Sequence, residues 1–448
     1  MAKNKIESFL RTFVKENISP KQEDISFVSE VYKSFTDVLG QGNCRQIGSL
    51  PRYTAIRPLH DLDVLYKISD ENFDTQNSES FLKELLEQLE RKYVNPTSYE
   101  IQTTVQTHSI SFLFMNGEDE VFAVDIVPAK VWGKNEFNDD TFLVPEIVQY
   151  RSHRKKQEFY YKLQASHQQM KWIKTDPLGY IAVASEINKI NDDFRKSVKF
   201  IKGWKNTCKE KNENFRLKSF HLEQLITIQL LENEDQTIFD TIFQLLTELK
   251  ENLKAPCIRD RADHSKFIDQ YVAELTDVEI ATIYQGIDSI LKSFEEFDGD
   301  VNSLMNAHYY ARGEQEEFLF DRKIPVLIDD SIIFTIDGLI KNSRAGEYIL
   351  TLSKNLWHIE RENSIKFFVA ANNSSFYNYL WKIKNDQNCE EVRGDISKDY
   401  QDEHHEDTKY FGGHYALGYL ISNDVCIAKS RADVIIRKPF RPKSRYHR

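Results

Sequence analysis

The sequence predicts an α+β protein in which a helical lobe lies between two strand-rich parts. Apolar residues recur at helical spacing over residues 1–40 and again over 180–305. Between these stretches, from residue 45 to about 129, and again after residue 313, short apolar runs have the length and alternation of strands. The 448 residues leave room for two to three domains of ordinary size.

Each helical stretch shows its buried face as a spaced apolar set. The clearest members are Ile6, Phe9, Leu10 and Phe13, then Val28, Val31, Phe35 and Val38, and later Phe239, Ile242, Phe243, Leu246 and Leu249. Ser19-Pro20 separates the first two sets, because proline cannot continue a helix. Strands are expected over 62–68, 109–115, 121–127, 324–328, 348–352, 365–370 and 418–421.

These patterns divide the chain into three predicted parts. The first is a core over residues 1–175, including the N-terminal helices, and the second is a helical lobe over 176–305. The texture changes again between residues 306 and 320, so the third part is expected over 315–448. Thr175-Asp176-Pro177 is placed just before the first helix of the lobe.

Composition narrows the function classes. The net charge of −11 disfavours wholesale binding to long nucleic acids, whereas small nucleotides fit it better. Five scattered cysteines without a Cys-x-x-Cys pair indicate reduced thiols. No apolar run approaches the roughly 20 residues of a membrane span, and the N-terminus has no signal-peptide core. We therefore expect a cytoplasmic protein without a membrane partner.

One motif indicates chemistry. Gly48-Ser49 precedes Asp61-Leu62-Asp63 by about a dozen residues. Because strand side chains alternate, Asp61 and Asp63 share one face, where two like charges are unfavourable unless a divalent cation lies beside them. Gly48 and Ser49 would form a tight turn whose backbone donors and hydroxyl reach phosphates.

A second strand supplies a third carboxylate. In the apolar run 122–127 only Asp125 is charged, and it is expected on the face opposite Phe122, Val124 and Ile126. Three converging carboxylates would hold two Mg²⁺ ions, for which Mn²⁺ can substitute, and these would support in-line transfer at a phosphate. A lone Asp-x-Asp is usually a solvated face. The combination with Gly-Ser and with Asp125 favours the metal site instead.

The same residues resemble a known group. The chain resembles the polymerase β-type nucleotidyltransferases in the order of three motifs: Gly-Ser, then Asp-hydrophobic-Asp, then the strand Val124-Asp125-Ile126-Val127-Pro128. Within that group it is most similar to the bacterial cGAS-like cyclic-oligonucleotide synthases, which are relatives of 2′-5′ oligoadenylate synthases. The resemblance covers about residues 40–305. It implies a polymerase β-like core with a helical second lobe, and it makes Lys202 a candidate phosphate ligand and Ser219 a candidate near the donor nucleotide. The alternatives are a solvated helix lysine and an N-cap hydroxyl.

Residues from about 315 onward carry a second resemblance. Blocks at 381–385, 392–395, 406–415 and 425–428 look like the predicted sensor domain called AGS-C, which is fused to many synthases of anti-phage (CBASS) operons. The resemblance implies regulation by an infection-related ligand.

Three features of this part leave alternatives open from the residues alone. The aromatics between Trp357 and Trp381 fit a ligand cleft or, more commonly, a core. The run 402–407 is interpreted as a mobile acidic loop rather than a metal site, and Gly412-Gly413-His414 as a turn. The basic tail 437–448 fits either a nucleic-acid contact or a solubilising end.

We therefore expect a two-metal synthase that links ATP and other nucleoside triphosphates into a ring, and whose product acts on a cognate effector. A linear 2′-5′ oligonucleotide synthase, or an enzyme that nucleotidylates RNA or protein, would need the same carboxylates. An inactive nucleotide-binding sensor is the alternative outside the enzymes; a core without activity has no chemical reason to hold three repelling acids together.

Overall fold

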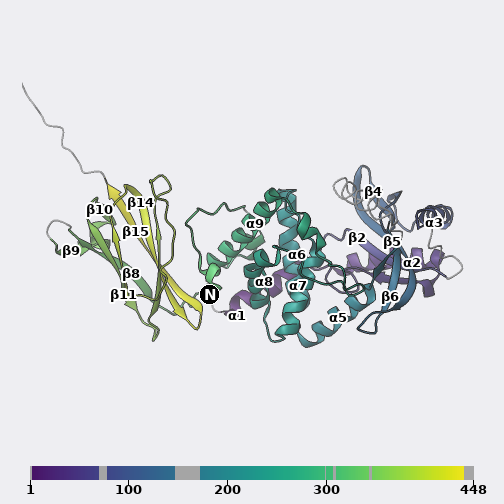
Figure 1. Cartoon of the computed structure of the whole chain (residues 1–448), viewed down its shortest axis with the longest axis horizontal. Helices are drawn as coiled ribbons and strands as arrows, with labels where there is room; N and C mark the ends of the chain where they lie inside the picture. The colour runs from purple at the N-terminus through teal and green to yellow at the C-terminus, as the bar shows by residue number, and fades with distance from the viewer. Residues whose placement is uncertain are drawn as a thin grey trace, which may run out of the picture.

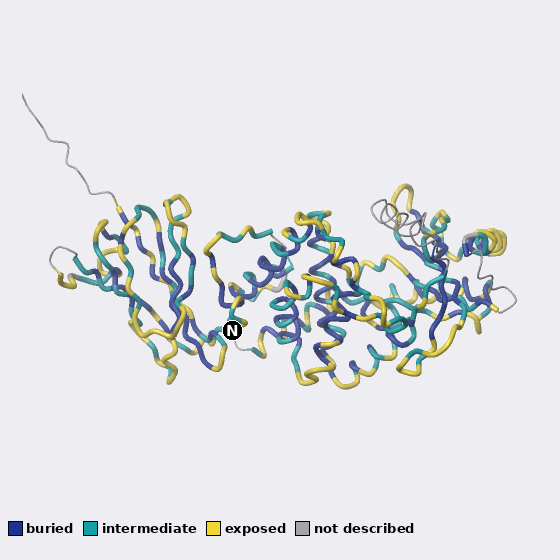
Figure 2. Tube along the Cα trace, viewed as in Figure 1, coloured by how far each residue is buried: buried dark blue, intermediate teal, exposed yellow. Residues whose placement is uncertain are grey.

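We describe a computed structural model of the protein over residues 3–69, 78–146, 172–297, 299–305, 309–342 and 346–437. Three parts lie in a row along the long axis, with a strand-rich part at each end and the helices between them (Figure 1). Buried residues run through each part (Figure 2). The predicted α+β class is confirmed.

The first part is a mixed sheet covered by helices. Its strands are β1 Cys44–Ile47, β2 Asp61–Lys67, β3 Glu100–Val105, β4 Ile110–Asn116, β5 Asp119–Lys134, β6 Asp140–Pro145 and β7 Trp172–Thr175. The order is β1-β2-β5-β4-β3, with β6 on β5 and β7 on β6, and among these described strands only β2 and β5 pair in parallel. The apolar faces of α2 Gln22–Leu39 and α3 Ser78–Lys92 share one buried cluster with the sheet.

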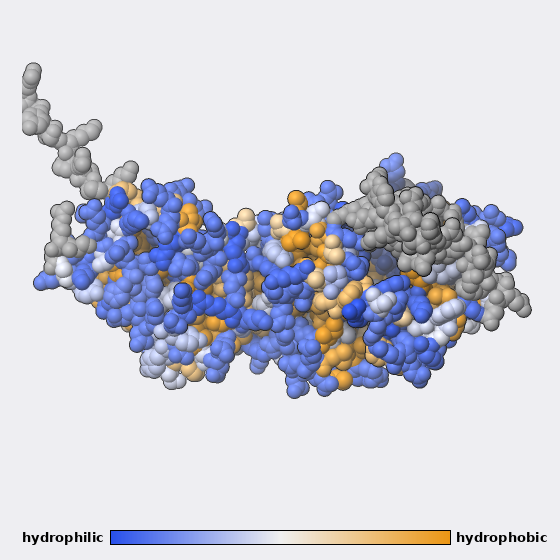
Figure 3. Space-filling model, viewed as in Figure 1, coloured by the Kyte–Doolittle hydropathy of each residue, from blue (hydrophilic) through white to orange (hydrophobic). Residues whose placement is uncertain are grey.

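The helical lobe forms the middle of the molecule. It contains α5 Pro177–Ile190, α6 Phe194–Lys211, α7 Ser219–Glu232, α8 Ile238–Asn252, α9 Asp277–Glu295 and α10 Val301–Met305. The helix α5 begins as expected after Thr175, because Asp176 accepts a hydrogen bond from the Gly179 amide (2.8 Å) and Pro177 occupies the first turn. Apolar side chains on the visible face gather over this middle region (Figure 3).

The first helix, α1 Lys3–Phe13, belongs to this lobe by its packing. Ile6 and Leu10 are buried in the same cluster as Phe239 of α8, whereas Val31 and Phe35 of α2 pack on the sheet. The segment Val14–Ile18 is π-helical and separates the two helices just before Pro20. The domain limits expected at residues 175 and 305 stay predictions, and α1 packs across the first of them.

The third part is a sandwich of two four-stranded sheets. One has the order β10-β15-β14-β12 and the other β13-β11-β8-β9. The bounds are β8 Phe334–Lys341, β9 Tyr348–Thr351, β10 His358–Glu360, β11 Ser364–Asn372, β12 Asn378–Lys384, β13 Glu403–Asp407, β14 Gly412–Ser422 and β15 Val425–Arg437. Of the aromatics between Trp357 and Trp381, Phe367, Tyr379 and Trp381 are buried in the core between the sheets, whereas Phe376 and Tyr377 are exposed. The core alternative therefore holds for part of the set.

Three local expectations in this part are wrong. The acidic run forms strand β13 and not a loop, because its backbone pairs with β11 and Glu406 is held by Arg393 and His404. Gly412 and Gly413 start strand β14 and make no turn; at Gly412 a side chain would collide with Asp386. Residues 324–328 form no strand, since only Val326 makes an isolated bridge, to Cys426. The tail beyond Arg437 lies outside the described residues.

Within the described residues, no helix combines the length and the apolar character that crossing a bilayer requires.

The sandwich core gives a stability prediction. Trp381 is fully buried and its indole N–H donates to the Gln401 carbonyl (2.8 Å), whereas Trp132 is 53% exposed. We expect Trp381→Ala to lower the free energy of unfolding by about 3–5 kcal/mol, because it leaves a cavity and an unpaired carbonyl. Urea unfolding followed by far-UV circular dichroism measures this change. Trp132→Ala is the matched control, and an equal loss in both variants would contradict the packing described.

Candidate active site

Strand pairing brings the three predicted aspartates together. On β2, the side chains of Leu62 and Val64 are fully buried, while Asp61 and Asp63 take the other face. The parallel register of β2 and β5 places Asp63 directly opposite Asp125. Neighbouring strands lie about 4.8 Å apart, so the three acidic positions share a small area of the sheet.

The charges in this area repel one another. Burial, followed by the charges of Asp61 and Asp125, raises the pKa of Asp63 to about 7, and Arg52 only partly opposes the shift. Burial also raises the pKa of Asp125, although Ser111 donates a hydrogen bond to its carboxylate. The described basic groups therefore neutralise the three acids only in part.

The chemistry of these residues suits divalent cations. Carboxylate oxygens are the ligands that Mg²⁺ prefers, and the excess of negative charge suits a cation. Among the residues that the structure describes, no three His, Cys, Asp or Glu side chains are already arranged around a common ion position. The reason is visible in Asp125, whose carboxylate is turned to the hydroxyls of Ser111 and Ser109. The set fits by chemistry, and the carboxylates would have to rotate to converge.

The Gly48-Ser49 turn lies against this acidic area. Gly48 has a φ of +76°, and a Cβ there would lie 1.9 Å from Asp63 Oδ2, so only glycine fits. The amide of Thr54 donates to the Ser49 carbonyl (3.0 Å), and the amide of Tyr53 donates to the Leu50 carbonyl (2.9 Å). The compact turn predicted from the sequence is present, and its Ser49 lines the cavity next to Asp61 and Asp63.

The environment of Lys202 matches neither of the two alternatives, the phosphate ligand and the solvated helix lysine. It is neither a solvated lysine nor a free phosphate ligand, because its ammonium is buried and donates to the Thr54 carbonyl (3.1 Å), to Thr54 Oγ1 (3.0 Å) and to Glu223 Oε2 (2.7 Å). Three contacts use the donor capacity of an ammonium. Arg52 binds the same Glu223 through Nε (2.6 Å). This buried ion network (Arg52, Thr54, Lys202 and Glu223) joins the Gly-Ser turn to α6 and α7.

Ser219 is the first residue of α7, and the N-cap position belongs to Lys218, so the N-cap interpretation is wrong. The Ser219 hydroxyl accepts a hydrogen bond from Lys205 Nζ (3.1 Å). Burial, together with the charges of Lys209 and Lys202, lowers the pKa of Lys205 to about 8. Among the described residues, Lys205 therefore has one hydrogen-bond partner, the neutral hydroxyl of the candidate nucleotide residue Ser219.

A cavity of about 680 Å³ lies between the sheet and the helical lobe. Its volume is within the range of small-molecule sites. Its polar lining includes Gly48, Ser49, Arg52, Asp61, Asp63, Tyr180, Lys202, Lys205, Lys209 and Ser219, whereas Asp125 is not part of the lining. The sequence interpretation missed Arg52, Lys205 and Lys209. The two lysines had a signal, because Lys202, Lys205 and Lys209 follow one another on one face of a helix.

Comparison with family models identifies the last part of the chain. Residues 314–437 match the model of the Adenylyl/Guanylyl and SMODS C-terminal sensor domain. These residues form an AGS-C domain. The second resemblance seen in the sequence is thus confirmed. Among the described residues, none from the AGS-C domain lines the cavity between the sheet and the helical lobe.

Solved structures similar to the chain include the following three. CdnC of E. coli MS115-1 with ATP has 17% identity and a TM-score of 0.49, covering 68% of this chain and 99% of that chain. The Rhodothermus marinus CdnE c-UMP-AMP synthase has 13% identity and a TM-score of 0.41; the match covers 64% of this chain and 97% of that chain. The Capnocytophaga granulosa CdnE c-di-GMP synthase has 19% identity and a TM-score of 0.37; the match covers 60% of this chain and 81% of that chain. No curated protein matches the chain.

The buried ion network gives a pH-dependent prediction. Although burial opposes it, contact with Lys202 and Arg52 lowers the pKa of Glu223 from 4.5 to about 2. Its contribution to stability is therefore complete above about pH 4.5 and is lost as the pH falls toward 2. We expect Glu223→Gln to lower the unfolding free energy at pH 7 by about 3–5 kcal/mol, because two buried cations lose their counter-charge.

Urea unfolding at pH 7 and at pH 3 measures both effects. The difference between wild type and Glu223→Gln should shrink at the lower pH. Exposed Glu210 lies on α6, and Glu210→Gln should match wild type at both pH values. A difference that does not change with pH would show that the carboxylate is not held by the cations.

Proposed function

We propose that the chain is a divalent-metal-dependent nucleotidyltransferase that joins ATP and other nucleoside triphosphates into a cyclic oligonucleotide. The observation that carries the proposal is the parallel register of β2 and β5, which sets Asp63 beside Asp125 and close to the turn at Gly48. A cavity with several basic side chains adjoins these acids. Carboxylates on one side and cations on the other are what a metal-bound triphosphate needs.

Each residue has a proposed part in the reaction. Mg²⁺ held by Asp61, Asp63 and Asp125 would neutralise charge on the triphosphate and lower the pKa of the attacking hydroxyl. Asp125 is proposed to accept the proton of the attacking ribose hydroxyl, since its strand sets it beside Asp63 at the catalytic metal position. The hydroxyl oxygen forms a bond to the α-phosphorus, and the bond from that phosphorus to pyrophosphate breaks.

The binding of the triphosphate is assigned to the other side of the cavity. The backbone donors of Gly48 and Ser49 would contact phosphate oxygens, as in other glycine turns. Lys205 replaces Lys202 in our assignment, because Lys202 has its donors occupied while Lys205 contacts only the Ser219 hydroxyl among its described hydrogen-bond partners. Ser219 would then lie near the donor nucleotide through this lysine.

The AGS-C domain supports a regulated enzyme in anti-phage defence. We propose that an infection-related ligand acts on this domain and that the cyclic product acts on a cognate effector. Two enzyme alternatives, a linear 2′-5′ synthase and an enzyme that nucleotidylates RNA or protein, share the same acids. Phosphatase-resistant small products favour the cyclic reaction, and label on added RNA or protein favours transfer to a macromolecule. Nucleotide binding without pyrophosphate release would favour an inactive sensor.

The acidic positions give the main activity prediction. We expect Asp63→Asn to reduce product formation at least about 100-fold with Mg²⁺ or Mn²⁺, because a metal-binding carboxylate is lost. The measurement uses each labelled triphosphate in turn, followed by phosphatase and chromatography. Asp119→Asn, at the exposed start of β5, is the matched control and should keep wild-type activity. Equal turnover by Asp63→Asn and wild type would refute the assignment.

The lysine assignment gives a second kinetic prediction. Lys205→Ala should raise the KM for the triphosphate about tenfold, since one charge-assisted contact of about 1.5 kcal/mol is lost, while the thermal midpoint changes little. Lys211, which is exposed at the end of α6, provides Lys211→Ala as the control with unchanged KM. An unchanged KM in Lys205→Ala would contradict this assignment and would mean that another residue of the cavity contacts the phosphate.

A further inference from the structure

A second cavity lies within the AGS-C domain, between its two sheets. Its volume is about 340 Å³, and strands of both sheets line it. The apolar part of the lining consists of Ile365, Phe367, Ile383, Val434 and Ile436. A cavity of this size can admit one large apolar or aromatic side chain together with part of its backbone. Its apolar floor favours such a group, because the side chain would leave water.

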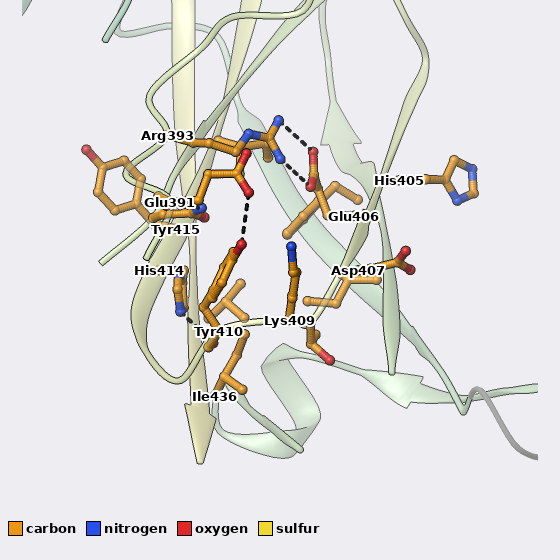
Figure 4. A pocket seen from close by; sticks show the side chains of 16 residues that line it. Glu391, Arg393, His405, Glu406, Asp407, Lys409, Tyr410, His414, Tyr415 and Ile436 are labelled. Carbon is orange, nitrogen blue, oxygen red and sulfur yellow. Dashed lines mark hydrogen bonds and ion pairs between the residues drawn. The ribbon is translucent and has the colours of Figure 1, made fainter. Parts of the chain in front are cut away.

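The mouth of this cavity is polar and mostly acidic. Arg393 binds Glu406 through two hydrogen bonds (2.8 and 3.2 Å), and Tyr410 donates to Glu391 (3.0 Å), as Figure 4 shows. The guanidinium of Arg393 also binds Asp395, so four of its five N–H donors are occupied within the protein. Lys409 lies beside Tyr410 at the mouth of the cavity. Its hydrogen bond to Tyr410, followed by the charges of Glu391 and Glu390, raises the pKa of Lys409.

The surrounding segment has a strong negative charge. Residues 386–407 contain nine Asp or Glu residues and two Lys or Arg residues, so their formal net charge is 2 − 9 = −7. Glu390 and Glu391 are exposed in this segment. An apolar floor beneath an acidic mouth is complementary to an aromatic side chain that has basic neighbours.

The chain itself contains such a sequence immediately after the cavity wall. Ile436 lines the cavity and β15 ends at Arg437. Residues 438–448 read Lys-Pro-Phe-Arg-Pro-Lys-Ser-Arg-Tyr-His-Arg, with five Lys or Arg residues and no acid. Phe440 follows Arg437 by three residues, so its backbone can reach about 10 Å from the end of the strand.

We propose that this cavity is a binding site for a basic peptide segment with an aromatic anchor, and that its occupant is the chain's own C-terminal segment 438–448, with Phe440 on the apolar floor. Pro439 lacks the N–H that would continue the β15 ladder, so the chain can leave the sheet at this point. Pro439 and Pro442 also reduce the entropy lost when the segment is ordered.

Because segment 438–448 is covalently linked to the domain, even a weak contact is sufficient for it to occupy the cavity. A segment linked by only a few residues has an effective concentration of the order of millimolar at a nearby site. The segment would then occupy the cavity even when the free peptide binds with a modest affinity. An external ligand of this cavity would have to displace it, which gives the AGS-C domain a defined state in the absence of that ligand.

The test uses the full chain and a labelled peptide of residues 438–448. In a tail variant, Phe440→Ser/Arg441→Glu/Lys443→Glu, the chain's own segment can no longer compete. Fluorescence anisotropy should show that this variant binds the peptide at least about tenfold more tightly than wild type does. The same peptide carrying Phe440→Ser should bind at least about tenfold more weakly to the tail variant, because the aromatic anchor is absent.

Two charge reversals in the tail-variant background locate the site. Glu390→Lys/Glu391→Lys should weaken peptide binding about tenfold, whereas Glu347→Lys, at the far edge of the β13-β11-β8-β9 sheet, should leave it unchanged. Exposed positions are used so that both variants keep the parent circular dichroism spectrum and thermal midpoint. The proposal is overturned if wild type and the tail variant bind the peptide equally, if the Phe440→Ser peptide binds as well as the original, or if both charge reversals weaken binding equally.

Discussion

The parallel pairing of β2 with β5 is the constraint on which the rest of the structure depends. In a strand the side chains alternate, so burial of Leu62 and Val64 forces Asp61 and Asp63 onto the opposite face. The register then sets Asp63 beside Asp125. The pairing concentrates negative charge that no described cation neutralises fully, and burial makes the repulsion stronger. Such an arrangement is unfavourable for folding alone, and a bound cation would relieve it.

The buried ion network connects this acidic area to the helical lobe. Glu223 from α7 binds Arg52 of the Gly-Ser turn and Lys202 of α6, so one carboxylate fixes three segments that surround the cavity. Removing the charge of Glu223 leaves both Arg52 and Lys202 without a counter-charge in the interior. The network therefore holds the two sides of the cavity in a fixed relation, and Lys205, three residues beyond Lys202, is left to face the space between them. The AGS-C domain packs its own core and contributes none of the described lining.

Local patterns in the sequence predicted the parts of the fold and site that depend on periodicity. The alternation around Asp61 and Asp125, the glycine at position 48 and the helical spacing after Asp176 are all short-range signals. Lys202 could not be placed, because its partner Glu223 is on another helix and no spacing rule links the two. The run 402–407 was misinterpreted since its pairing with β11 is a long-range contact. Lys205 was missed although the helical spacing from Lys202 indicated a shared face.

The most direct test of the metal-binding claim is a crystal structure of the full chain with Mn²⁺ and a triphosphate analogue that cannot be cleaved. Our account predicts anomalous peaks within about 2.0–2.3 Å of the carboxylates of Asp61 and Asp63, with Asp125 rotated from Ser111 to one of these ions. It also predicts the analogue's phosphates between these ions and Lys205. Anomalous peaks that avoid all three carboxylates while the analogue is bound would contradict it.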